Sequence, residues 1–192
     1  MTIRDQKFIY HLTSVDNVPS ILCRGLLPRA VLGAGFTDIA DAQIVEGRRA
    51  GALECFVPFH WFAKNPFDGR VHRDRPGAHF ILIAVARTHA KAHNWKVIAK
   101  HPLAGGVGEL LDYDTGFNQI DWDTMGRREY LDSVCRHVCM AECLAPGAVP
   151  VASFAKIFTP TEGIRQLVLN EAKAKGLTNL WVDSNPNMFP TR

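Results

Sequence analysis

A single carboxylate interrupts a run of residues that otherwise has the character of a protein core. Glu142 lies inside the segment 140–144 (MAECL), and the nearest basic residues along the chain are Arg136 and His137. An unpaired buried carboxylate costs several kcal/mol. Glu142 is therefore expected either to reach solvent or to line a cleft in which it takes part in catalysis.

His11 and Thr13 form a second pair of groups that could do chemistry. Residues 7–13 are rich in aromatic and β-branched side chains, which predicts a strand. Residues two apart on a strand face the same side, so the imidazole and the hydroxyl could together donate to and accept from a ribose or an amide. The residues alone leave open a histidine that is satisfied in the core or at the surface.

The cysteines suggest packing rather than metal binding. Cys135, Cys139 and Cys143 recur every four residues with His137 among them, and on one helix they would share a face. Structural zinc sites add a distant second pair of ligands, which the sequence lacks, so we expect core residues and no metal. The P-loop, Rossmann and G-x-S-x-G signatures are also absent, so a dinucleotide would have to bind by another route.

Composition limits the class of protein. The 192 residues are 47% apolar and 21% charged, which predicts one globular domain over 1–192. The net charge is only +3, but residues 64–101 hold four Lys, four Arg and five His against two Asp. This asymmetry suggests an anionic partner on one face, or a solvated loop beside a strand. With no signal peptide, no run of about 18 apolar residues and an odd number of cysteines, we expect a cytoplasmic protein without a membrane span.

The elements that must position these groups follow from the hydrophobic pattern. We expect strands at 7–13, 54–62, 79–86, 155–158 and 180–182. We expect helices from a Thr13 cap to Gly25, at 38–50, from Asp121, at 127–138 and from a Thr159 cap to Lys175. Pro58 indicates that 54–62 is an edge strand or contains a bulge.

Three stretches are less regular. We expect a loop over 64–77 and irregular structure over 102–120, where Gly105 to Gly108 form a flexible loop. Residues 140–144 are either the end of the preceding helix or a strand, and we favour the strand. Because strands and helices do not alternate regularly, the pattern favours an α+β fold with mainly antiparallel pairing.

These motifs resemble one known family. The segment 10–27 (YHLTSVDNVPSILCRGLL) is similar to the opening of the DarT family of NAD-dependent DNA ADP-ribosyltransferase toxins, where Y-H-[IF]-T precedes a D-N pair, an I-L pair and a Gly-Leu exit. The similarity continues at 44–49, at 56–62 (FVPFHWF, resembling Y-V-P-F-Y-F), at 120–123 and at 141–142. It departs at His60 and Trp61, where two aromatic residues are common, and in the loop before Glu142, which differs in length and sequence.

The resemblance implies an ADP-ribosyltransferase-like α+β fold, with two antiparallel sheets in a split sandwich and flanking helices, that grips NAD as its substrate. It assigns cofactor contacts to His11, Thr13 and Asn17, and the catalytic carboxylate to Glu142. Arg48, or Arg49 if the register shifts by one, would be catalytic and would neutralise the pyrophosphate, which a forked guanidinium suits. A carboxylate near the ribose 2′-hydroxyl would stabilise the positive charge that develops as nicotinamide leaves.

The implied acceptor is a base of single-stranded DNA, thymine first and guanine next, because an unpaired base spares the cost of flipping. Cationic side chains would bind phosphates and aromatic ones would stack on bases. The candidates are Arg70, Arg73, Arg75 and Arg136, with Trp61, Tyr113, Phe117 and Trp122; core packing is the alternative for the two tryptophans. The implied partner is a macrodomain antitoxin that removes the modification. Transfer to RNA or protein, and non-catalytic binding of single strands, stay open as alternatives.

Overall fold

The fold was examined in a computed structural model, which describes residues 1–33, 35–39, 46, 48–49, 52–101 and 109–191. The strands are β1 Phe8–Ser14, β2 Phe56–His60, β3 Phe80–Ala86, β4 Lys96–Ile98, β5 Glu142–Pro146, β6 Lys156–Thr159 and β7 Val182–Ser184. The helices are α1 Val18–Arg24, α3 Pro66–Asp74, α4 Arg87–Ala92, α5 Tyr113–Gln119, α6 Trp122–Arg127, α7 Ser133–Val138 and α8 Glu162–Ala174.

The strands form one seven-stranded sheet in the order β4-β5-β2-β1-β3-β6-β7, where two sheets were expected. All neighbours pair antiparallel except β6 and β7, so the α+β prediction with mainly antiparallel pairing is confirmed. The sheet is nevertheless almost divided. β1 pairs with β3 over seven residues, but it pairs with β2 only at Tyr10 and His60. Beyond that pair the two central strands separate, and the gap between them is called the split below.

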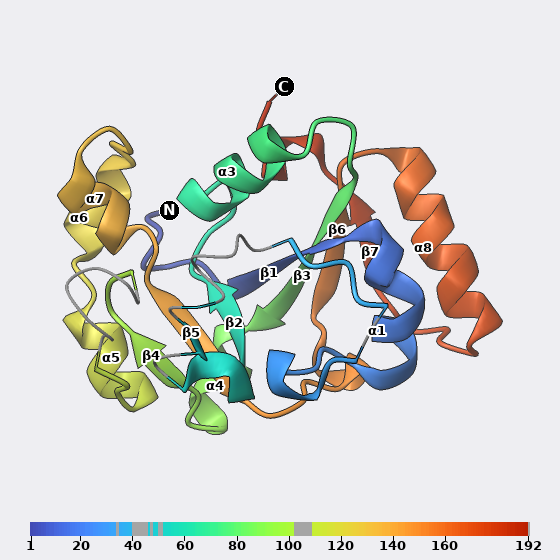
Figure 1. The fold of residues 1–192 in the computed structure, drawn as a ribbon, viewed down its shortest axis with the longest axis horizontal. Helices are drawn as coiled ribbons and strands as arrows, with labels where there is room; N and C mark the ends of the chain where they lie inside the picture. Colours follow the sequence, from blue (N-terminus) through green and yellow to red (C-terminus); the bar gives the residue numbers. More distant parts are fainter. Residues whose placement is uncertain (34, 40–45, 47, 50–51, 102–108, 192) are drawn as a thin grey trace.

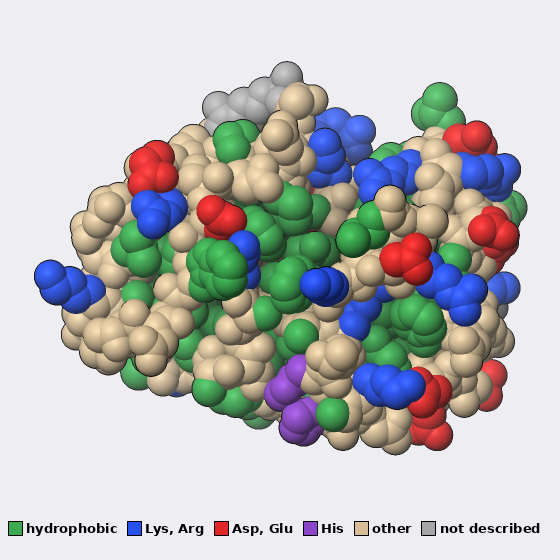
Figure 2. Space-filling model, turned by 180° about the vertical axis from the view of Figure 1, so that it is seen from behind, with side chains coloured by type: hydrophobic (Ala, Val, Ile, Leu, Met, Phe, Trp, Pro, Cys, Tyr) green, Lys and Arg blue, Asp and Glu red, His purple; other side chains and the backbone are tan. Residues whose placement is uncertain are grey.

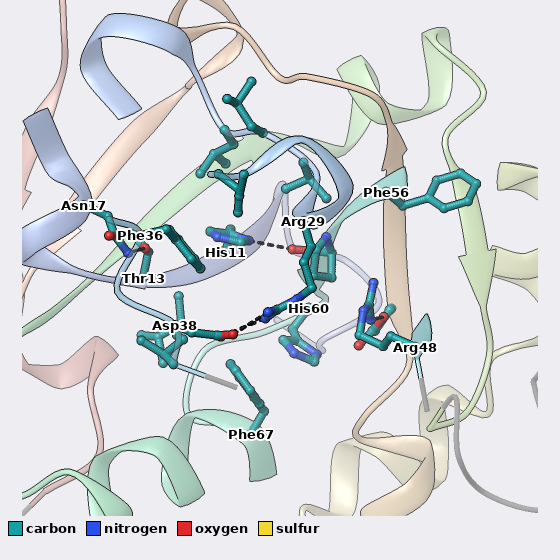
Figure 3. Close-up of a pocket in the computed structure, with 18 of the residues that line it drawn as sticks. His11, Thr13, Asn17, Arg29, Phe36, Asp38, Arg48, Phe56, His60 and Phe67 are labelled. Carbon is teal, nitrogen blue, oxygen red and sulfur yellow. Dashed lines mark hydrogen bonds and ion pairs between the residues drawn. The ribbon is translucent and has the colours of Figure 1, made fainter. Parts of the chain in front are cut away.

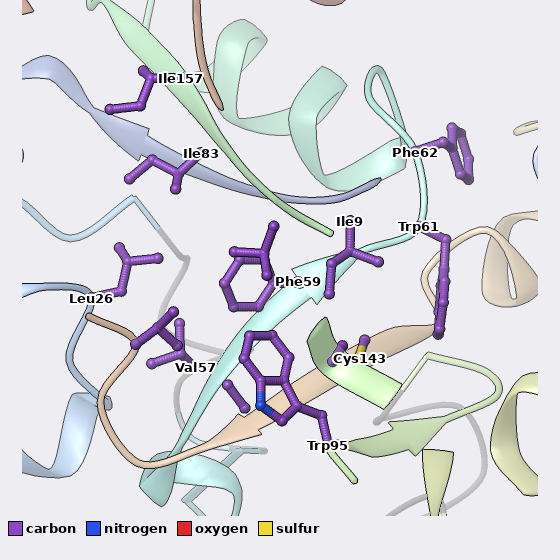
Figure 4. Packing of buried hydrophobic residues seen from close by; sticks show 14 of the residues in the cluster. Ile9, Leu26, Val57, Phe59, Trp61, Phe62, Ile83, Trp95, Cys143 and Ile157 are labelled. Carbon is purple, nitrogen blue, oxygen red and sulfur yellow. The ribbon is translucent and has the colours of Figure 1, made fainter. Parts of the chain in front are cut away.

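Apolar side chains pack on both faces of the sheet. Along β3, Ile81, Ile83 and Val85 join the larger core cluster, while Phe80, Leu82 and Ala84 join a smaller cluster on the other face. A strand buried on both faces has a continuous apolar sequence, as β3 does. Figure 4 shows the larger cluster, in which Phe59 and Val57 of β2 pack near Ile9 of β1 and Cys143 of β5.

Helices flank the sheet unevenly. In Figure 1, α8 and α1 stand at the β6–β7 end, α5, α6 and α7 stand at the β4 end, and α3 lies alongside the strands between them. On the back of the molecule, Lys and Arg side chains are interspersed with Asp and Glu side chains, in keeping with the small net charge (Figure 2). Of the helices in the described part of the chain, none combines the length and the apolarity that crossing a lipid bilayer requires.

Gly25 ends α1, as expected, and it does so with a φ of +77°. A Cβ at this position would lie 2.4 Å from the carbonyl oxygen of Val149, so a larger residue is excluded on both counts. The backbone of the next residue, Leu26, pairs with Val149 in an isolated bridge. This close approach fixes the course of the chain as it leaves α1 and enters the wall of the split.

The expected loop at 64–77 is wrong, because its middle is the helix α3. Asn65 caps this helix, with its Oδ1 accepting the backbone N–H of Asp68 at 3.0 Å, and Pro66 occupies the first turn. The Asp68 carboxylate in turn accepts the N–H of Lys64 at 2.8 Å. These reciprocal bonds are a strong helix start. They outweigh the Gly, Pro and charged residues that suggested a loop.

Other helices and strands also begin or end at residues different from those predicted. Residues 113–119 of the expected irregular stretch form α5, and residues 102–108 lie outside the described part of the chain. The helix expected from Asp121 is α6, which Asp121 caps and which ends at Arg127. The helix expected at 127–138 is only α7, because Arg128 adopts a φ of +54° and the chain becomes helical again at Ser133. The cap of α8 is Thr161 rather than Thr159, and the first turn after β1 is capped by Ser14 rather than Thr13. In both cases the preceding strand runs further than expected.

Candidate active site

The split contains a cavity, which is called the main cavity below. Its wall includes residues from β1 and α1 on one side, from β2 and β5 on the other, and from the segments 25–39 and 48–53. The polar residues that line it are His11, Thr13, Asn17, Ser20, Arg29, Asp38, Arg48, His60, His101 and Glu142. The four catalytic and cofactor-binding positions predicted from sequence, together with Asn17, thus lie around one cavity, and Figure 3 shows most of them pointing into it.

Glu142 is paired with Arg48 in the wall of this cavity. The Nη1 of Arg48 lies 2.5 Å from Oε2 of Glu142, although 94 residues separate them in sequence, and both side chains are less than a tenth exposed. Such a pair is well shaped for a charge-assisted hydrogen bond. Arg48 keeps a second nitrogen, Nη2, that is buried and has no partner within the described part of the chain. An unpaired buried donor costs about 1–3 kcal/mol, so a ligand that accepts from it would be stabilised there.

The two neighbouring arginines differ sharply in their exposure to solvent. Arg48 is 7% exposed and lines the cavity. The side chain of Arg49 is 79% exposed and approaches only Glu54, at 3.7 Å. Both residues are helical, but most of the expected helix at 38–50 lies outside the described residues. Arg48 is therefore the arginine available to a ligand in the cavity.

His11 lies at the point where β1 and β2 part. Its Nδ1 is 2.8 Å from the carbonyl oxygen of Pro58, which can only accept, so Nδ1 carries the hydrogen and Nε2 is left as an acceptor. Burial lowers the pKa of His11 to about 4, against the opposing effect of that carbonyl, so the ring is neutral at physiological pH. The main-chain amide and carbonyl of a strand residue point to the same side. The carbonyl of Pro58 points into the split, and its nitrogen, which carries no hydrogen, lies on the same side. A proline is therefore tolerated here without an unpaired N–H, although β2 is an internal strand and not the edge strand that Pro58 suggested.

Thr13 and Asn17 both line the cavity, but Asn17 is fully engaged by the protein. Its Nδ2 donates to Thr13 Oγ1 at 3.1 Å and to the carbonyl of Thr37 at 3.0 Å, and its Oδ1 accepts the N–H of Thr37 at 2.9 Å. These bonds tie the segment around Thr37 to β1. Thr13 keeps its hydroxyl hydrogen, so it can still donate to a ligand.

Three further groups in the cavity were not predicted from sequence. Arg29 and Asp38 form a two-pronged ion pair, in which Nη2 donates to Oδ1 at 2.7 Å and Nη1 donates to Oδ2. His60 is 6% exposed and stacks on Phe67 of α3, and its buried Nδ1 has no hydrogen-bond partner among the described residues. Of these three residues, only His60 stood out in the sequence, because it replaces one of the two aromatic residues that are common at this place in the family. The pairing of Arg29 with Asp38 has no such signal, because nothing in the chain's periodicity links the two residues.

One part of the cavity is apolar. The side chains that line this part come from the segment after α1, from the start of β2 and from residues close to them: Leu26, Leu27, Leu32, Phe36, Ile39, Leu53 and Phe56. Pockets that bind small molecules combine such surface with a few placed polar groups. The Arg29–Asp38 pair and the Arg48–Glu142 pair supply those groups here.

A second hollow, the basic groove, opens beside the main cavity. It is lined by Lys64, Asn65, Pro66, Phe67, Gly69, Arg70, Arg73, His101, Tyr130, Leu131, Arg136, His137, Met140 and Pro190. None of these lining residues is acidic. Phe67, His101 and Met140 line both hollows, so the groove and the cavity meet there. Three of the four arginines predicted to bind DNA therefore share one groove, whereas Arg75 does not line it.

The aromatic residues proposed to stack on bases lie elsewhere. Trp61 is fully buried and Tyr113 is 5% exposed, so neither is open to a base, and that expectation is wrong for both. Phe117 and Trp122 are half-buried and pack edge-on against Trp61, with Arg87 held over the indoles of Trp61 and Trp122. Trp122 also donates its Nε1–H to the carbonyl of Phe117 at 2.9 Å. This cluster joins α5 and α6 to the sheet, as the core-packing alternative holds.

Within residues 1–33, 35–39, 46, 48–49, 52–101 and 109–191, no three His, Cys, Asp or Glu side chains gather in a way that could hold a metal ion. The sulfur atoms of Cys135 and Cys139 are buried and 4.0 Å apart. Burial raises the pKa of Cys139 to about 12, so its thiol stays protonated.

Comparisons with known proteins give a consistent result. The model of a family described as "ssDNA thymidine ADP-ribosyltransferase, DarT" matches residues 10–190. Among solved structures, the chain is similar to Thermus sp. 2.9 DarT in complex with ADP-ribosylated ssDNA, with a TM-score of 0.86, 20% identity and 99% of both chains covered. It is also similar to Thermus sp. 2.9 DarT in complex with NAD⁺, with a TM-score of 0.77, 17% identity, and 97% of this chain and 98% of that chain covered.

A further similar structure is longer than this chain. Thermosipho africanus DarTG in complex with ADP-ribose matches with a TM-score of 0.76 and 22% identity, over 97% of this chain and 52% of that one. At these identities the structural matches establish the fold, and the family match extends over nearly the whole sequence. A comparison with curated protein sequences gave no match.

Proposed function

The chain belongs to the DarT family of ADP-ribosyltransferases that act on thymidine in single-stranded DNA, and from this membership we propose how its residues carry out the reaction. ADP-ribose is transferred from NAD to a thymine base of single-stranded DNA, and nicotinamide is released. The observation that carries the assignment of residues is the ion pair of Glu142 and Arg48 in the wall of a cavity that His11 and Thr13 also line.

NAD lies in the main cavity. The nicotinamide end and its ribose are held near His11 and Thr13, where the neutral Nε2 of His11 accepts and the Thr13 hydroxyl donates. The unpaired Nη2 of Arg48 faces the pyrophosphate or the ribose that follows it. The apolar part of the cavity suits the adenine ring. Asn17 acts by holding the segment around Thr37 in place, because its own amide is already bonded to the protein.

Glu142 stabilises the transition state. As the bond to nicotinamide lengthens, positive charge builds on the ribose, and a carboxylate bonded to the 2′-hydroxyl gains attraction as that charge grows. Arg48 holds the Glu142 side chain at 2.5 Å and so fixes its orientation. A group in this role contributes about 10²–10⁴ in rate.

The DNA strand enters through the basic groove. Arg70 and Arg73 of α3 face it from one side and Arg136 of α7 from the other, so phosphates can be bound along its length. The groove meets the cavity at Phe67, which places an entering base beside the ribose of a bound NAD. Arg75 and Trp122, also predicted to bind DNA, lie outside this path, and no role in it is assigned to them.

The biological setting follows the family. One similar structure is named DarTG, and we propose a macrodomain antitoxin as the partner that reverses the modification. We further propose that residues 1–192 act as one domain in the cytoplasm. Expression of the active chain alone would then arrest growth, and expression of the Glu142→Gln variant would not.

The transfer is tested with short synthetic strands. The protein is incubated with NAD and single-stranded DNA that contains one thymine, and the strand is weighed by mass spectrometry. Addition of one ADP-ribose is expected for this strand, but not for a strand of the same length without thymine or for the Glu142→Gln variant. An RNA strand with one uracil, which carries the same imide group, tests the alternative acceptor. Modification of RNA alone, or of no strand, would contradict the proposal.

A further inference from the structure

His60 occupies a position in the sheet that brings it beside Glu142. It is the last residue of β2, and it pairs with Glu142 of β5 on one side and with Tyr10 of β1 on the other. Residues directly opposite on antiparallel strands place their Cβ atoms about 5 Å apart on the same face. The imidazole is therefore a neighbour of the carboxylate, and Figure 3 shows it between Phe67 and Arg48.

The ring of His60 is held in place, but one of its nitrogens is unused. The residue is almost fully buried, and the ring stacks on Phe67 with the centroids 5.4 Å apart and the planes at 30°. Nδ1 is buried without a hydrogen-bond partner among the residues that the structure describes. Buried polar atoms are nearly always paired. Because His60 lines the main cavity, a molecule bound there can supply the partner that Nδ1 lacks.

The location of His60 indicates which molecule that is. Phe67, His101 and Met140 line both the main cavity and the basic groove. A base that enters by the groove reaches the cavity at Phe67, the ring on which His60 stacks. It therefore arrives where His60 and Glu142 lie side by side, on the acceptor side of the reaction.

Transfer to thymine releases a proton that some group must accept. N3 is the only ring nitrogen of thymidine not bonded to the sugar, and it carries a hydrogen. When N3 bonds to C1′ of the ribose, the bond from C1′ to nicotinamide breaks, and its electron pair returns to the nicotinamide ring, which leaves uncharged. The N3 proton leaves at the same time. Glu142 is already paired with Arg48, and in its proposed role it also bonds to the ribose 2′-hydroxyl. Another group must therefore take the N3 proton.

We propose that Nδ1 of His60 accepts the N3 proton of the target thymine as N3 bonds to the ribose. The proposal rests on the proposed transfer to thymine and names the acceptor-side residue of that same site. With the imidazole hydrogen on Nε2, Nδ1 has the lone pair that this step needs. The proton then passes to water as the modified strand leaves.

The electrostatic surroundings keep the ring able to accept a proton. Burial lowers the pKa of His60, and the neighbouring Arg48 and His101 lower it further, whereas Glu142 and the Ala141 backbone raise it. His11 faces the same ring from β1 and is itself neutral at physiological pH. The uncharged form of His60 is therefore the one present when a base arrives.

The test uses three substitutions at one position. Phe keeps the stacking on Phe67 but has no nitrogen, Asn places its polar atoms at the reach of Nδ1, and Gln places them at the reach of Nε2. With a strand that contains one thymine, His60→Phe should lower the single-turnover rate about 10²–10⁴-fold while NAD binding, measured by calorimetry, is unchanged. His60→Asn and His60→Gln restore a polar group at one of these two places, but an amide does not accept a proton near neutral pH, so both should stay close to the rate of His60→Phe. Thermal melting checks that each variant is folded.

The pH dependence separates proton transfer from a structural effect. In alkaline solution N3 of thymine loses its proton to the solvent, so the ratio of the wild-type rate to that of His60→Phe should shrink as pH rises. A ratio that stays constant with pH, a rate close to wild type in His60→Asn or His60→Gln, an unchanged rate in His60→Phe, or a parallel loss of NAD binding would each overturn the role of His60. A wild-type protein that modifies no DNA would instead defeat the proposed function itself.

Discussion

The ion pair between Arg48 and Glu142 allows a sharp test, because the two residues are far apart in sequence. The perturbations are Glu142→Gln, Arg48→Met and the double variant. The pair is 2.5 Å apart, and the side chains are 9% and 7% exposed. With the charge centres about 4 Å apart and an effective dielectric constant of about 20, the attraction is about 4 kcal/mol. Removal of one partner from a buried pair costs about 3–5 kcal/mol, since the other charge is left uncompensated.

The cavity admits solvent, so the lower end of that range, about 3 kcal/mol, is expected for each single variant. For a chain of this size, 1 kcal/mol corresponds to about 2–4 °C in Tm, which gives a fall of about 6–12 °C. The double variant loses both charges together, so its Tm should lie close to that of either single variant. The coupling energy of the cycle should therefore be about 3 kcal/mol.

Arg49→Met is the matched control. Its side chain is 79% exposed and lies 3.7 Å from Glu54, a geometry that contributes about 0.5 kcal/mol or less. Its Tm should therefore change by no more than about 1–2 °C. The assay is thermal unfolding without NAD, followed by calorimetry. Single variants that melt like the Arg49 control, or a double variant in which two large effects simply add, would show that the buried pair does not exist in solution.

Three further predictions concern binding and pH. His11→Ala should weaken NAD binding about 3–10-fold in calorimetry, the equivalent of one hydrogen bond, and binding at wild-type His11 should not vary between about pH 6 and 8 because its pKa is about 4. Arg73→Ala should lower the slope of log Kd for single-stranded DNA against log salt by about 0.7 in fluorescence titrations, whereas Arg75→Ala should leave it unchanged. Burial raises the pKa of Asp68 from 3.8 to about 7, so the stability that the protonated side chain contributes is lost as pH rises between these two values. The free energy of unfolding of Asp68→Asn, measured in urea, should therefore rise relative to that of the wild type by up to about 4 kcal/mol between pH 4 and 8. A gain that does not grow with pH would show that Asp68 titrates normally.

The central strands and the carboxylate that lines the cavity could be predicted from the sequence because their signals are local. Alternation and β-branched residues mark β1 and β3, and a single acid in the apolar run 140–144 marks Glu142. The spacing of His11 and Thr13 predicted that both face the same side of a strand, and in the structure both line one cavity. For these residues, the local sequence pattern and the burial in the folded protein agree.

The rest depends on contacts between distant segments. No local pattern indicates that β1 and β2 share one pair and then separate, so the split and the single sheet had to come from the structure. The same holds for Arg29 with Asp38 and for His60 with Glu142, which meet through chain reversal and strand register. The error at α3 was different in kind. Its capping residues are visible in the sequence, but Gly69 and the surrounding charges were given more weight.

The most direct test of the account is a structure of the Glu142→Gln variant with NAD and a short strand that contains one thymine. The account predicts that the nicotinamide ribose lies within hydrogen-bonding distance of residue 142, with the pyrophosphate near Arg48. It also predicts the thymine at the junction beside Phe67 and the strand in the basic groove. NAD bound away from residue 142, or DNA bound on a face remote from that groove, would contradict it.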